Sequence, residues 1–537
     1  MEFNFSEKFI KKLIKFADPS SREFLALQRN FAKETKQPFI SNDRLLQSYH
    51  KLIASGIIKE NKKIESFLKL KNTRSSSGIV VISVLTKPFP CPGNCLYCPT
   101  EPSVPKSYLS NEPAVMRAIM CKYHPFRQVE MRLKALEAVG HLTDKINIRI
   151  IGGTWSAYPK QYQTWFVKEL FEAANKIHVS GNTSLTALEN LQLANETAKH
   201  RIVEISIETR QDYISHEEIL RLRKLSVTKV ELGVQSLYDD VLLLNRRGNQ
   251  NQDTIAATKL LKDAGFKVSY QMMANLPGSS IERDKAMFKT LFEDPDFRPD
   301  HLKIYPLALV KNAPVYDLYQ AGKYRPYNDQ ELTDLLIEIK KEIPRYCRIE
   351  RVIRDIPATE IVEGGSKISN LRQIVQNKMA AQNLYCQCIR CREVKNNYDS
   401  SEEIKLFRED CDASSGREIF LSIENASRNK LYAILRLRIP SAGKIGVLKN
   451  SAIIREIHTY GNQAKLGVQS ENSPQHHGFG KSLVKEAEKI ALEEFDKTRV
   501  AVIAGVGVRG YFRKLGYELE ATYMVKNNGR YFIDYLK

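Results

Sequence analysis

Residues 79–98 read IVVISVLTKPFPCPGNCLYC, a β-rich apolar run that leads directly into three closely spaced cysteines. Similar apolar runs recur along the chain, at 146–151, 202–207, 229–234, 267–273 and 301–306. Helical patterns separate them, at about 113–139, 160–178, 184–199, 215–225, 251–264 and 281–292. Strands that alternate with helices predict an α/β fold with a parallel sheet, either doubly wound or a partial barrel. In both cases chemistry is expected at the carboxyl ends of the strands.

The three cysteines after the first predicted strand, Cys91, Cys95 and Cys98, have the spacing C-x3-C-x2-C. Thiolates this close can bind three corners of one 4Fe–4S cube and leave the fourth iron without a protein ligand. An open coordination position is typical of catalytic metal sites. The spacing therefore favours a catalytic iron–sulfur site. The alternative is a zinc ion with Cys121 as its fourth ligand.

Glycine and polar residues follow at the ends of the next three predicted strands, in the segments 151–154 (IGGT), 207–210 (IETR) and 233–236 (GVQS). With the cysteine motif, this order resembles the radical S-adenosylmethionine (SAM) superfamily. The resemblance implies that the open iron binds SAM. It also implies the cofactor contacts: Gly152 and Gly153 beside the methionine moiety, Glu208 on the ribose, Arg210 near the carboxylate, and Gln235.

The charge balance of the 537 residues points to a polyanionic partner. Lys and Arg number 82 against 62 Asp and Glu, a net charge of +20. Nucleic acid is the first candidate, and a solvated basic surface is the alternative. Residues 1–75 look helical and basic, with Phe9, Ile10, Leu13 and Ile14 on one helical face. We expect that face to dock on the protein rather than on a membrane.

The chain has the features of a cytoplasmic protein with no membrane partner. No run approaches the roughly 18 apolar residues of a membrane span. The first residues lack the apolar core and cleavage site of a signal peptide. The nine cysteines are odd in number and clustered, which does not fit a secreted disulfide framework.

A second cysteine group, Cys386, Cys388 and Cys391, is too tightly spaced for disulfide pairing. With Cys347, the nearest further thiol, it would supply four thiolates for a structural zinc ion. Such a site would fix the relative pose of two domains. The alternatives are a second iron–sulfur cluster or a three-cysteine site completed by a histidine.

A further cofactor motif, QHHGFG at 475–480, lies between a predicted strand at 451–459 and a helix that ends near residue 494. Backbone N–H groups of such a turn, followed by a helix N-terminus, bind anions. With the strand at 499–504 and the run VRGYFRKLGY at 508–517, this order resembles the GNAT acetyltransferases. The resemblance implies that the pyrophosphate of acetyl-CoA lies on Gln475, His476, His477, Gly478, Phe479 and Gly480.

One residue departs from the GNAT pattern. Many GNAT enzymes place a tyrosine four residues before the glycine of the K-L-G motif, where it can protonate the departing thiolate. This chain has Phe512 there, with Tyr511 beside it. Phenylalanine cannot donate a proton. Either Tyr511 takes this role, or the reaction is not ordinary acetyl transfer to an amine.

The order of motifs over nearly the whole chain, including KSY at 106–108, EPAVMRA at 112–118 and NLPG at 275–278, resembles the family of Elongator catalytic subunits, the tRNA uridine(34) acetyltransferases, in their bacterial or archaeal form. The implied fold is a radical-SAM partial (β/α)6 barrel with a C-terminal GNAT α/β domain. The predicted domains are a basic helical tRNA-binding segment at 1–75, the radical-SAM domain at 76–343, a basic zinc-binding linker at 344–417 and the GNAT domain at 418–537.

The family implies a reaction as well as a fold. An adenosyl radical takes a hydrogen from the acetyl methyl group, the carbon radical adds to carbon 5 of the wobble uridine, and thioester hydrolysis leaves 5-carboxymethyluridine. Lys87, just before the cysteines, is a catalytic candidate near the acetyl group. The anticodon stem-loop of tRNA would contact Lys106, Tyr108, Arg117 and Arg127, with Tyr108 available for base stacking. A homodimer and Elongator-type partner subunits both stay open.

Two other functions fit parts of the sequence. A protein lysine acetyltransferase with a structural iron–sulfur cluster would use the GNAT motif, but Phe512 argues against it. A non-catalytic tRNA-binding scaffold would explain the basic charge, but the intact cysteine triad argues against that function.

Overall fold

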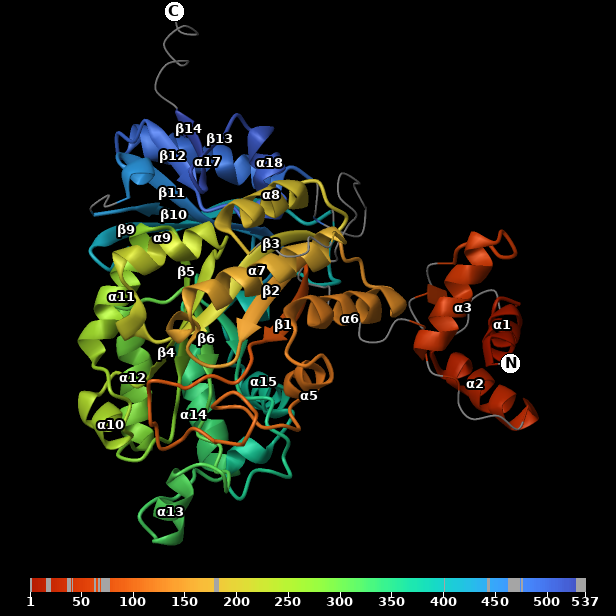
Figure 1. Ribbon diagram of the computed structural model, residues 1–537, viewed down its shortest axis with the longest axis horizontal. Coiled ribbons are helices and arrows are strands. Elements are labelled where there is room, and N and C mark those ends of the chain that lie inside the picture. The colour runs from red at the N-terminus through yellow and green to blue at the C-terminus, as the bar shows by residue number, and fades with distance from the viewer. Residues whose placement is uncertain are drawn as a thin grey trace, which may run out of the picture.

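The computed structural model of the chain describes residues 2–15, 21–35, 40, 42–61, 64, 65, 68, 78–177, 183–399, 401–441, 445–461, 474 and 477–527. Three helices come first, followed by a parallel sheet with helices and then by a second, mixed sheet (Figure 1). In this part of the chain, no helix has both the length and the apolar character that a bilayer crossing requires.

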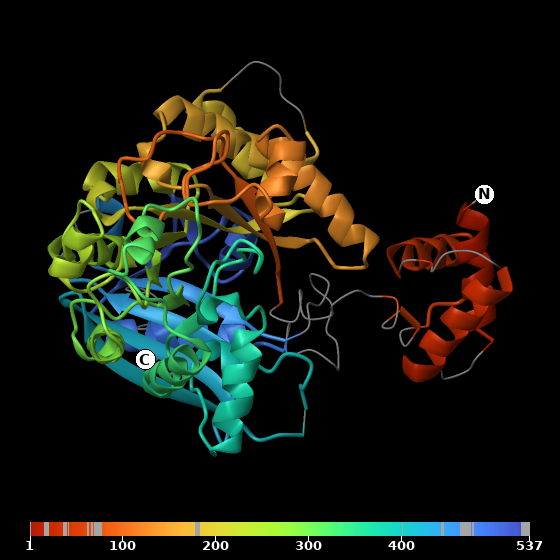
Figure 2. The same cartoon turned by 90° about the horizontal axis from the view of Figure 1, so that it is seen from below.

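The N-terminal helices are α1 (Glu2–Leu13), α2 (Ser21–Thr35) and α3 (Asn42–Ala54). Phe9, Ile10 and Leu13, which belong to the predicted apolar face of α1, are fully buried among apolar side chains of α2 and α3. The three helices therefore cover one another's apolar faces. In both Figure 1 and Figure 2 they lie to one side of the two sheets.

The predicted strands form one parallel sheet in which the strands follow sequence order. They are β1 (Val80–Leu85), β2 (Lys145–Ile151), β3 (Arg201–Thr209), β4 (Lys229–Gln235), β5 (Lys267–Met272), β6 (His301–Ile304) and β7 (Arg348–Arg351). The six predicted strands are confirmed. The seventh, β7, pairs with β6 and comes from the segment that we expected to be a linker. The sheet is thus a half barrel with β1 and β7 at its edges.

Helices connect these strands. They are α5 (Pro113–Met120), α6 (Pro125–Ala138), α7 (Lys160–Asn175), α8 (Leu185–Asn195), α9 (His216–Lys224), α10 (Asp239–Leu244), α11 (Asn251–Asp263), α12 (Ile281–Glu293), α13 (Val315–Gln320) and α14 (Asp329–Glu342). Two more, α15 (Leu371–Ala381) and α16 (Ile389–Arg392), follow the last strand. The pattern predicted as one helix over 113–139 is two helices, because Pro125 is favoured at the first turn of a new helix.

The two faces of the half barrel differ in chemistry. On β2, Ile146, Ile148 and Ile150 pack in the apolar core shared with α6 and α7. The alternating residues Asn147 and Arg149 point to the inner face, where they line a cavity of about 540 Å³. Complete (β/α)8 barrels fill this space with branched apolar side chains. Here the inner face is polar and partly hollow.

The C-terminal sheet has the strand order β13-β14-β12-β11-β10-β9-β8. Its strands are β8 (Ile404–Ala413), β9 (Gly416–Asn425), β10 (Leu431–Ile439), β11 (Ser451–Thr459), β12 (Arg499–Val502), β13 (Glu518–Glu520) and β14 (Tyr523–Asn527). The long helix α17 (Phe479–Glu493) packs on one face of this sheet, and the short helix α18 (Arg509–Arg513) follows β12. Because β8 pairs with β9 along its whole length, the sheet begins before the expected boundary at residue 418.

The other face of the C-terminal sheet covers the amino ends of the half-barrel strands (Figure 1). A Cβ atom on Gly505 would lie 2.0 Å from the carbonyl oxygen of Val203, so only glycine permits this approach. Arg455 of β11 donates to both carboxylate oxygens of Asp300, at 2.9 and 2.5 Å, just before β6. The two sheets are therefore joined by close backbone contact and by buried charge.

Candidate active site

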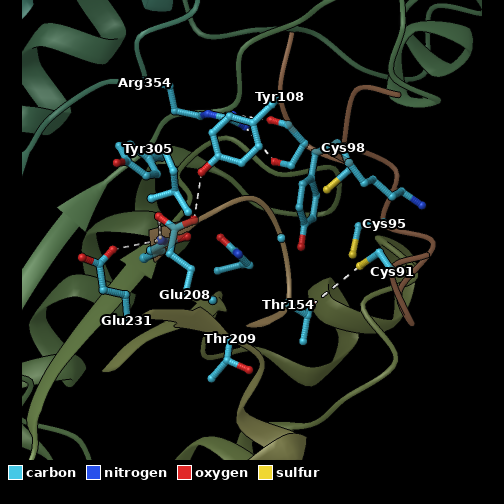
Figure 3. Close-up of a pocket in the computed structure, with 18 of the residues that line it drawn as sticks. Cys91, Cys95, Cys98, Tyr108, Thr154, Glu208, Thr209, Glu231, Tyr305 and Arg354 are labelled. Carbon is cyan, nitrogen blue, oxygen red and sulfur yellow. Dashed lines mark hydrogen bonds between the residues drawn. The ribbon is translucent and has the colours of Figure 1, made fainter. Parts of the chain in front are cut away.

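The cysteine loop lies at the carboxyl ends of the strands, as predicted for a catalytic site. Cys91, Cys95 and Cys98 line one pocket together with residues that end β2, β3 and β4. Figure 3 shows their sulfur atoms on one side of this pocket and the carboxylates of Glu208 and Glu231 on the other.

The surroundings of the three thiols favour the thiolate form, which is the form that binds metal. Arg247 is buried, and its Nη1 lies 3.9 Å from the sulfur of Cys95. A hydrogen bond with Cys98 and the charge of Arg247 lower the pKa of the Cys95 thiol to about 5, although burial opposes the shift. The sulfurs of Cys91, Cys95 and Cys98 are not close enough together to bind a single metal ion. In a 4Fe–4S cluster each cysteine binds a different iron, so the sulfurs lie farther apart. The arrangement therefore fits a cluster better than one ion. Cys121, the alternative ligand, does not line the pocket.

Two predicted residues shape the loop itself. Lys106 donates to the carbonyl oxygen of Gly93 at 2.9 Å and to the side chain of Asn94 at 3.4 Å. Arg210 forms a two-point ion pair with Asp212, at 2.9 and 2.7 Å, and also donates to two backbone carbonyls at 247 and 248. A Cβ atom on Gly93 would lie 2.7 Å from Arg210. Both cations therefore support the cysteine loop in this structure.

Glu208 lies at the centre of a polar network within the pocket. Its carboxylate accepts from the Tyr108 hydroxyl at 2.9 Å and from Gln271 at 3.1 Å, and it lies 3.5 Å from the Lys303 ammonium. Burial raises the pKa of Tyr108 well above its usual value, so the phenol stays protonated and donates. Arg354 lies over the Tyr108 ring. The network holds the Glu208 carboxylate in a fixed orientation toward the pocket.

Gly152, Gly153 and Gln235 all have positive φ angles, of 127°, 105° and 71°. Gly153 and Gln235 line the pocket. Gly152 packs against the neighbouring strand end, where a Cβ atom would lie 2.2 Å from Oγ1 of Thr86. On Gly153 a Cβ atom would meet nothing within 4 Å. The first glycine is required by packing, and the second leaves room for a ligand.

This contrast predicts different results for the two alanine variants. Gly152→Ala combines a backbone strain of about 1–3 kcal/mol with a clash of similar size, so the free energy of unfolding should fall by about 2–6 kcal/mol. Gly153→Ala should lose only the strain of about 1–3 kcal/mol, while its methyl group should weaken the SAM binding that the resemblance implies for this pocket. Denaturant unfolding and equilibrium dialysis with SAM measure the two effects. Equal losses of stability would contradict this assignment.

Other predicted residues lie away from the pocket. The Lys87 ammonium lies over the ring of Tyr162, at 5.0 Å from the centroid, and Lys87 does not line the pocket. Arg117 on α5 lines the cavity inside the half barrel, and Arg127 is exposed on α6. The structure thus gathers Lys106 and Tyr108 at the cysteine pocket and separates them from Arg117 and Arg127.

The second cysteine group is compact. The sulfurs of Cys386, Cys388 and Cys391 lie within 4.8 Å of one another, which suits a single metal ion. Lys340 and Gln376 lie 3.7 and 3.6 Å from the Cys391 sulfur. Cys347 is buried nearby and its carbonyl accepts from Ile389, but its sulfur is not part of the compact group. The structure thus gathers three of the four predicted ligands.

In the C-terminal motif, the structure describes His477, Gly478, Phe479 and Gly480. Gly478 has a φ angle of 87° and precedes α17, which begins at Phe479, while His477 lies beside the Phe479 ring. Gln475 and His476 lie outside the described residues. A Cβ atom on Gly480 would lie 2.9 Å from the Tyr511 hydroxyl. Phe512 is buried in the core, so Tyr511 faces the turn.

Several polar and charged residues of the site were given no role from the sequence, because none has a spacing that by itself points to chemistry. Arg149, Arg247, Glu231 and Tyr305 all line the cysteine pocket. Arg354 was expected to extend a basic patch, and it also begins the stretch RDIP at 354–357 that resembles the family. Inward alternation on the strands points to Arg149 and Glu231, and Glu231 also begins the stretch ELGVQSLY at 231–238 that resembles the family.

Family comparisons agree with this geometry. A model described as the Radical SAM superfamily matches residues 90–291, and one described as the Radical_SAM C-terminal domain matches 299–381. A tRNA uridine(34) acetyltransferase of Methanocaldococcus infernus is 44% identical over 481 residues, which cover 87% of this chain and 89% of the relative. Elongator complex protein 3 of Danio rerio is 38% identical over 86% of both chains.

A solved structure is also similar. The archaeal Methanocaldococcus infernus Elp3 with an N-terminal deletion (1–46) superposes with a TM-score of 0.73 at 42% identity. The match covers 84% of this chain and 99% of that one. The chain belongs to the family of the tRNA uridine(34) acetyltransferases and Elongator complex protein 3.

Proposed function

We propose that the chain is a tRNA-modifying enzyme that uses SAM radical chemistry and acetyl-CoA to form 5-carboxymethyluridine at the wobble position of tRNA. One observation carries the proposal: a pocket lined by three cysteines and a glycine turn ahead of a long helix lie on two sheets that are firmly joined. The names of the relatives support uridine 34 as the modified nucleoside.

In the cysteine pocket, Cys91, Cys95 and Cys98 would hold the 4Fe–4S cluster. When bound, this cluster supplies the electron that cleaves SAM to methionine and a 5′-deoxyadenosyl radical. Arg247 stabilises the thiolate charge from its buried position. Glu208, oriented by Tyr108 and Gln271, is placed to accept hydrogen bonds from ribose hydroxyls. Gly153 leaves room for the methionine moiety.

At the C-terminal turn, the backbone N–H groups of 478–480 and the amino end of α17 would bind the acetyl-CoA pyrophosphate. We assign the proton donor for the departing CoA thiolate to Tyr511. Burial raises the pKa of Tyr511 to about 12, so the phenol is protonated at neutral pH and can donate.

The Tyr511→Phe variant tests this assignment. Loss of one positioned acid should slow thiol release from acetyl-CoA by about 10²-fold, since general acids contribute this much. Binding of acetyl-CoA should change little, because the ring remains. Thiol release is followed with a chromogenic disulfide, and binding by equilibrium dialysis. Phe512→Leu, at a buried neighbour, is the control. Thiol release at the wild-type rate in Tyr511→Phe would remove Tyr511 from the mechanism.

Substrate tRNA accounts for the basic charge of the chain. We propose that Arg117 and Arg127 contact phosphates, and that Lys106 and Tyr108 act where the anticodon meets the cysteine pocket. The helices of the N-terminal segment would add phosphate contacts without base readout. We also propose a structural zinc ion on Cys386, Cys388 and Cys391, with Cys347 as the fourth ligand.

Mass spectrometry of tRNA nucleosides tests the function as a whole. The full chain is loaded anaerobically with iron and sulfide and incubated with tRNA, SAM, acetyl-CoA and a reductant. 5-Carboxymethyluridine should form only when all four are present. Acetyl-lysine formation without any modified uridine would instead identify a protein acetyltransferase.

A further inference from the structure

The two proposed cofactor sites lie at opposite ends of the half barrel. The cysteine loop follows the carboxyl end of β1, whereas the C-terminal sheet covers the amino ends of β3, β5 and β6. β2 has seven residues, so at about 3.3 Å per residue the barrel is roughly 20 Å long. If the proposed function holds, the acetyl methyl group must cross this length to meet the radical.

A hollow runs through the barrel between these two ends. It has a volume of about 540 Å³. At the end next to the C-terminal sheet it is lined by Glu456 and His458 of β11 and by Tyr460. Ile457, between the first two, would lie 3.5 Å from a Cβ atom on Gly480 of the phosphate-binding turn. Successive residues of a strand point to opposite faces. The strand that borders the acetyl-CoA turn on one face therefore borders the hollow on the other.

At its upper end the hollow adjoins the cysteine pocket. The same six residues line both spaces: Ser83, Pro113, Ala114, Arg149, Arg351 and Asp355. They come from β1, α5, β2, β7 and the segment after β7, which is the open side of the half barrel. The two spaces therefore adjoin each other beside β1.

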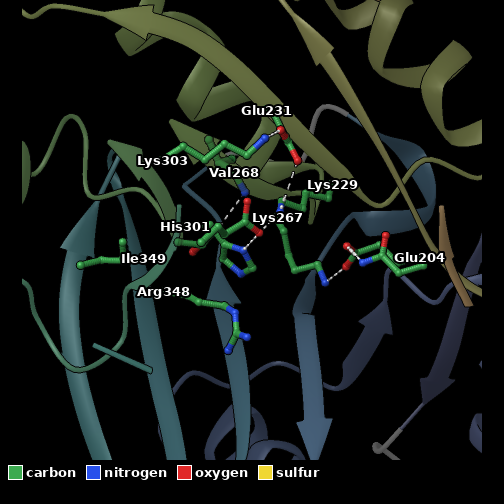
Figure 4. A network of polar contacts seen from close by, with 12 residues as sticks. Glu204, Lys229, Glu231, Lys267, Val268, His301, Lys303, Arg348 and Ile349 are labelled. Carbon is green, nitrogen blue, oxygen red and sulfur yellow. Dashed lines mark hydrogen bonds and ion pairs between the residues drawn. The ribbon is translucent and has the colours of Figure 1, made fainter. Parts of the chain in front are cut away.

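The opposite wall of the hollow is filled by paired charges (Figure 4). Lys229 pairs with Glu350, and Lys267 pairs with Glu204. Nδ1 of His301 lies 2.9 Å from Glu350 and its Nε2 lies 3.6 Å from Glu456 of the C-terminal sheet. Because these side chains neutralise one another, space for a ligand is left beside β1, past Val81 and Ser83.

Two buried atoms beside this path lack a hydrogen-bond partner among the described residues. They are Oδ1 of Asn147, an acceptor, and Nε of Arg149, a donor. Asn147 pairs in register with Val81, and Arg149 pairs with Ser83. The two side chains are two residues apart on β2 and therefore lie on the same face of the sheet. Buried polar groups are costly unless a ligand or water satisfies them. A chain that carries amide N–H and C=O groups matches one acceptor and one donor.

We propose that the hollow binds the amide-bearing thioester arm of acetyl-CoA, which runs along β1 from the C-terminal sheet to the cysteine pocket. This inference rests on the proposed function. It assigns the contacts with the arm to Asn147 and Arg149 and the wall of the passage to Val81 and Ser83.

Protection of an introduced thiol tests the proposal without catalysis. In a Ser83→Cys variant, alkylation by iodoacetamide is followed by peptide mass spectrometry in the presence of S-acetonyl-CoA, a non-cleavable analogue. At 100 times its Kd the analogue should slow alkylation at this position by about 100-fold. 3′-Phospho-ADP, which has the nucleotide but not the arm, should not protect it. Leu406→Cys, on the far edge strand β8, should be alkylated at one rate throughout.

Binding of the labelled analogue is measured in the same samples by equilibrium dialysis. If the analogue binds but the thiol of Ser83→Cys stays fully reactive, the proposal that the arm lies in the hollow is wrong. The proposal is also wrong if 3′-phospho-ADP protects this thiol, or if a stem-loop RNA protects it and the analogue does not. If the analogue does not bind at all, the proposed function itself fails.

Narrowing the path gives a second test. Val81→Trp replaces a side chain that is 42% exposed on edge strand β1, and Leu406→Trp replaces one that is 44% exposed on edge strand β8. With CD3-labelled acetyl-CoA, deuterium transfer into 5′-deoxyadenosine should fall by about 100-fold in Val81→Trp and stay normal in the control. Normal transfer in Val81→Trp overturns the proposal. If Val81→Trp no longer cleaves SAM, Ser83→Phe is used in its place. Reduced deuterium transfer in Ser83→Phe then supports the proposal, and normal transfer overturns it.

Discussion

Replacing Cys95 by serine should reduce reductive SAM cleavage by on the order of 10³-fold or more, because removal of one member of a catalytic unit abolishes most of its activity. Cys95 is the most buried thiol of its triad, and it is the one that faces Arg247. A serine hydroxyl at this position does not ionise and is a poor ligand for iron. Bound iron, the iron–sulfur absorbance and modified uridine should be lost together.

Cys121→Ser provides the matched control. Cys121 is equally buried, at 2% exposure, yet it lines neither the cysteine pocket nor the second triad. We expect normal iron content and normal 5-carboxymethyluridine formation in this variant. A Cys95→Ser protein that keeps its iron and its activity, or a Cys121→Ser protein that loses both, would show that the ligand set is wrong.

Replacing Asp300 by asparagine should lower the free energy of unfolding by about 3–5 kcal/mol, since it leaves buried cations without their partner. Asp300 accepts two hydrogen bonds from Arg455 and one from the backbone N–H of Val268, at 2.8 Å. Burial alone would raise the pKa of Asp300, but the charges of Arg455 and Arg436 outweigh it and hold this pKa well below its usual range.

The sign of the pH dependence follows from that shift. A carboxyl group with a depressed pKa in the folded state stabilises the protein above its unfolded pKa of about 3.9. That contribution is lost as the pH falls through the lower, folded value. The difference between wild type and Asp300→Asn should therefore be full at pH 7 and shrink below about pH 4.

Denaturant unfolding at several pH values measures the effect of Asp300→Asn. Asp412→Asn is the comparison, because Asp412 is 75% exposed and pairs with Arg417 at the surface. That variant should lie within about 0.5 kcal/mol of wild type. If both variants lose the same stability, the buried pair does not hold the two sheets together.

Much of the fold could be predicted from periodicity and composition. The apolar runs gave the strands of the half barrel to within a few residues, because buried parallel strands are nearly continuous in apolar residues. β7 escaped because its sequence RIER has a single apolar residue and reads as a charged surface. β8 escaped for a related reason: its side chains alternate between exposed and partly buried positions, so the segment looked like a polar linker.

The site was predictable where a motif fixes the spacing and not where charges meet from distant segments. The cysteine loop, Gly152, Gly153 and Glu208 come from consecutive strand ends, which a parallel sheet brings to one edge. The network of Arg149, Glu231, Lys303 and His301 has no local signature. In the sequence each is a single charge, and only inward alternation on different strands brings them together.

The same applies to the basic stretch from Arg345 to Arg354, which we expected to extend a nucleic-acid surface. In the structure Arg348 pairs with Glu393, Arg345 lies 3.6 Å from Glu424 and Arg354 lies 3.6 Å from Glu112. Their acidic partners lie 45 to 242 positions away in the sequence. Charge counting over a short window cannot identify such partners.

The contact of Gly505 with Val203 has a consequence for how the protein works over a catalytic cycle. A junction without space for a methyl group, reinforced by Asp300 and Arg455, does not act as a hinge. Enzymes whose domains close about a hinge bring their reactants together by moving one domain toward the other. If the proposed function holds, this junction fixes the distance between the two cofactor sites, so delivery would depend on a carrier that is tethered at one site and reaches the other.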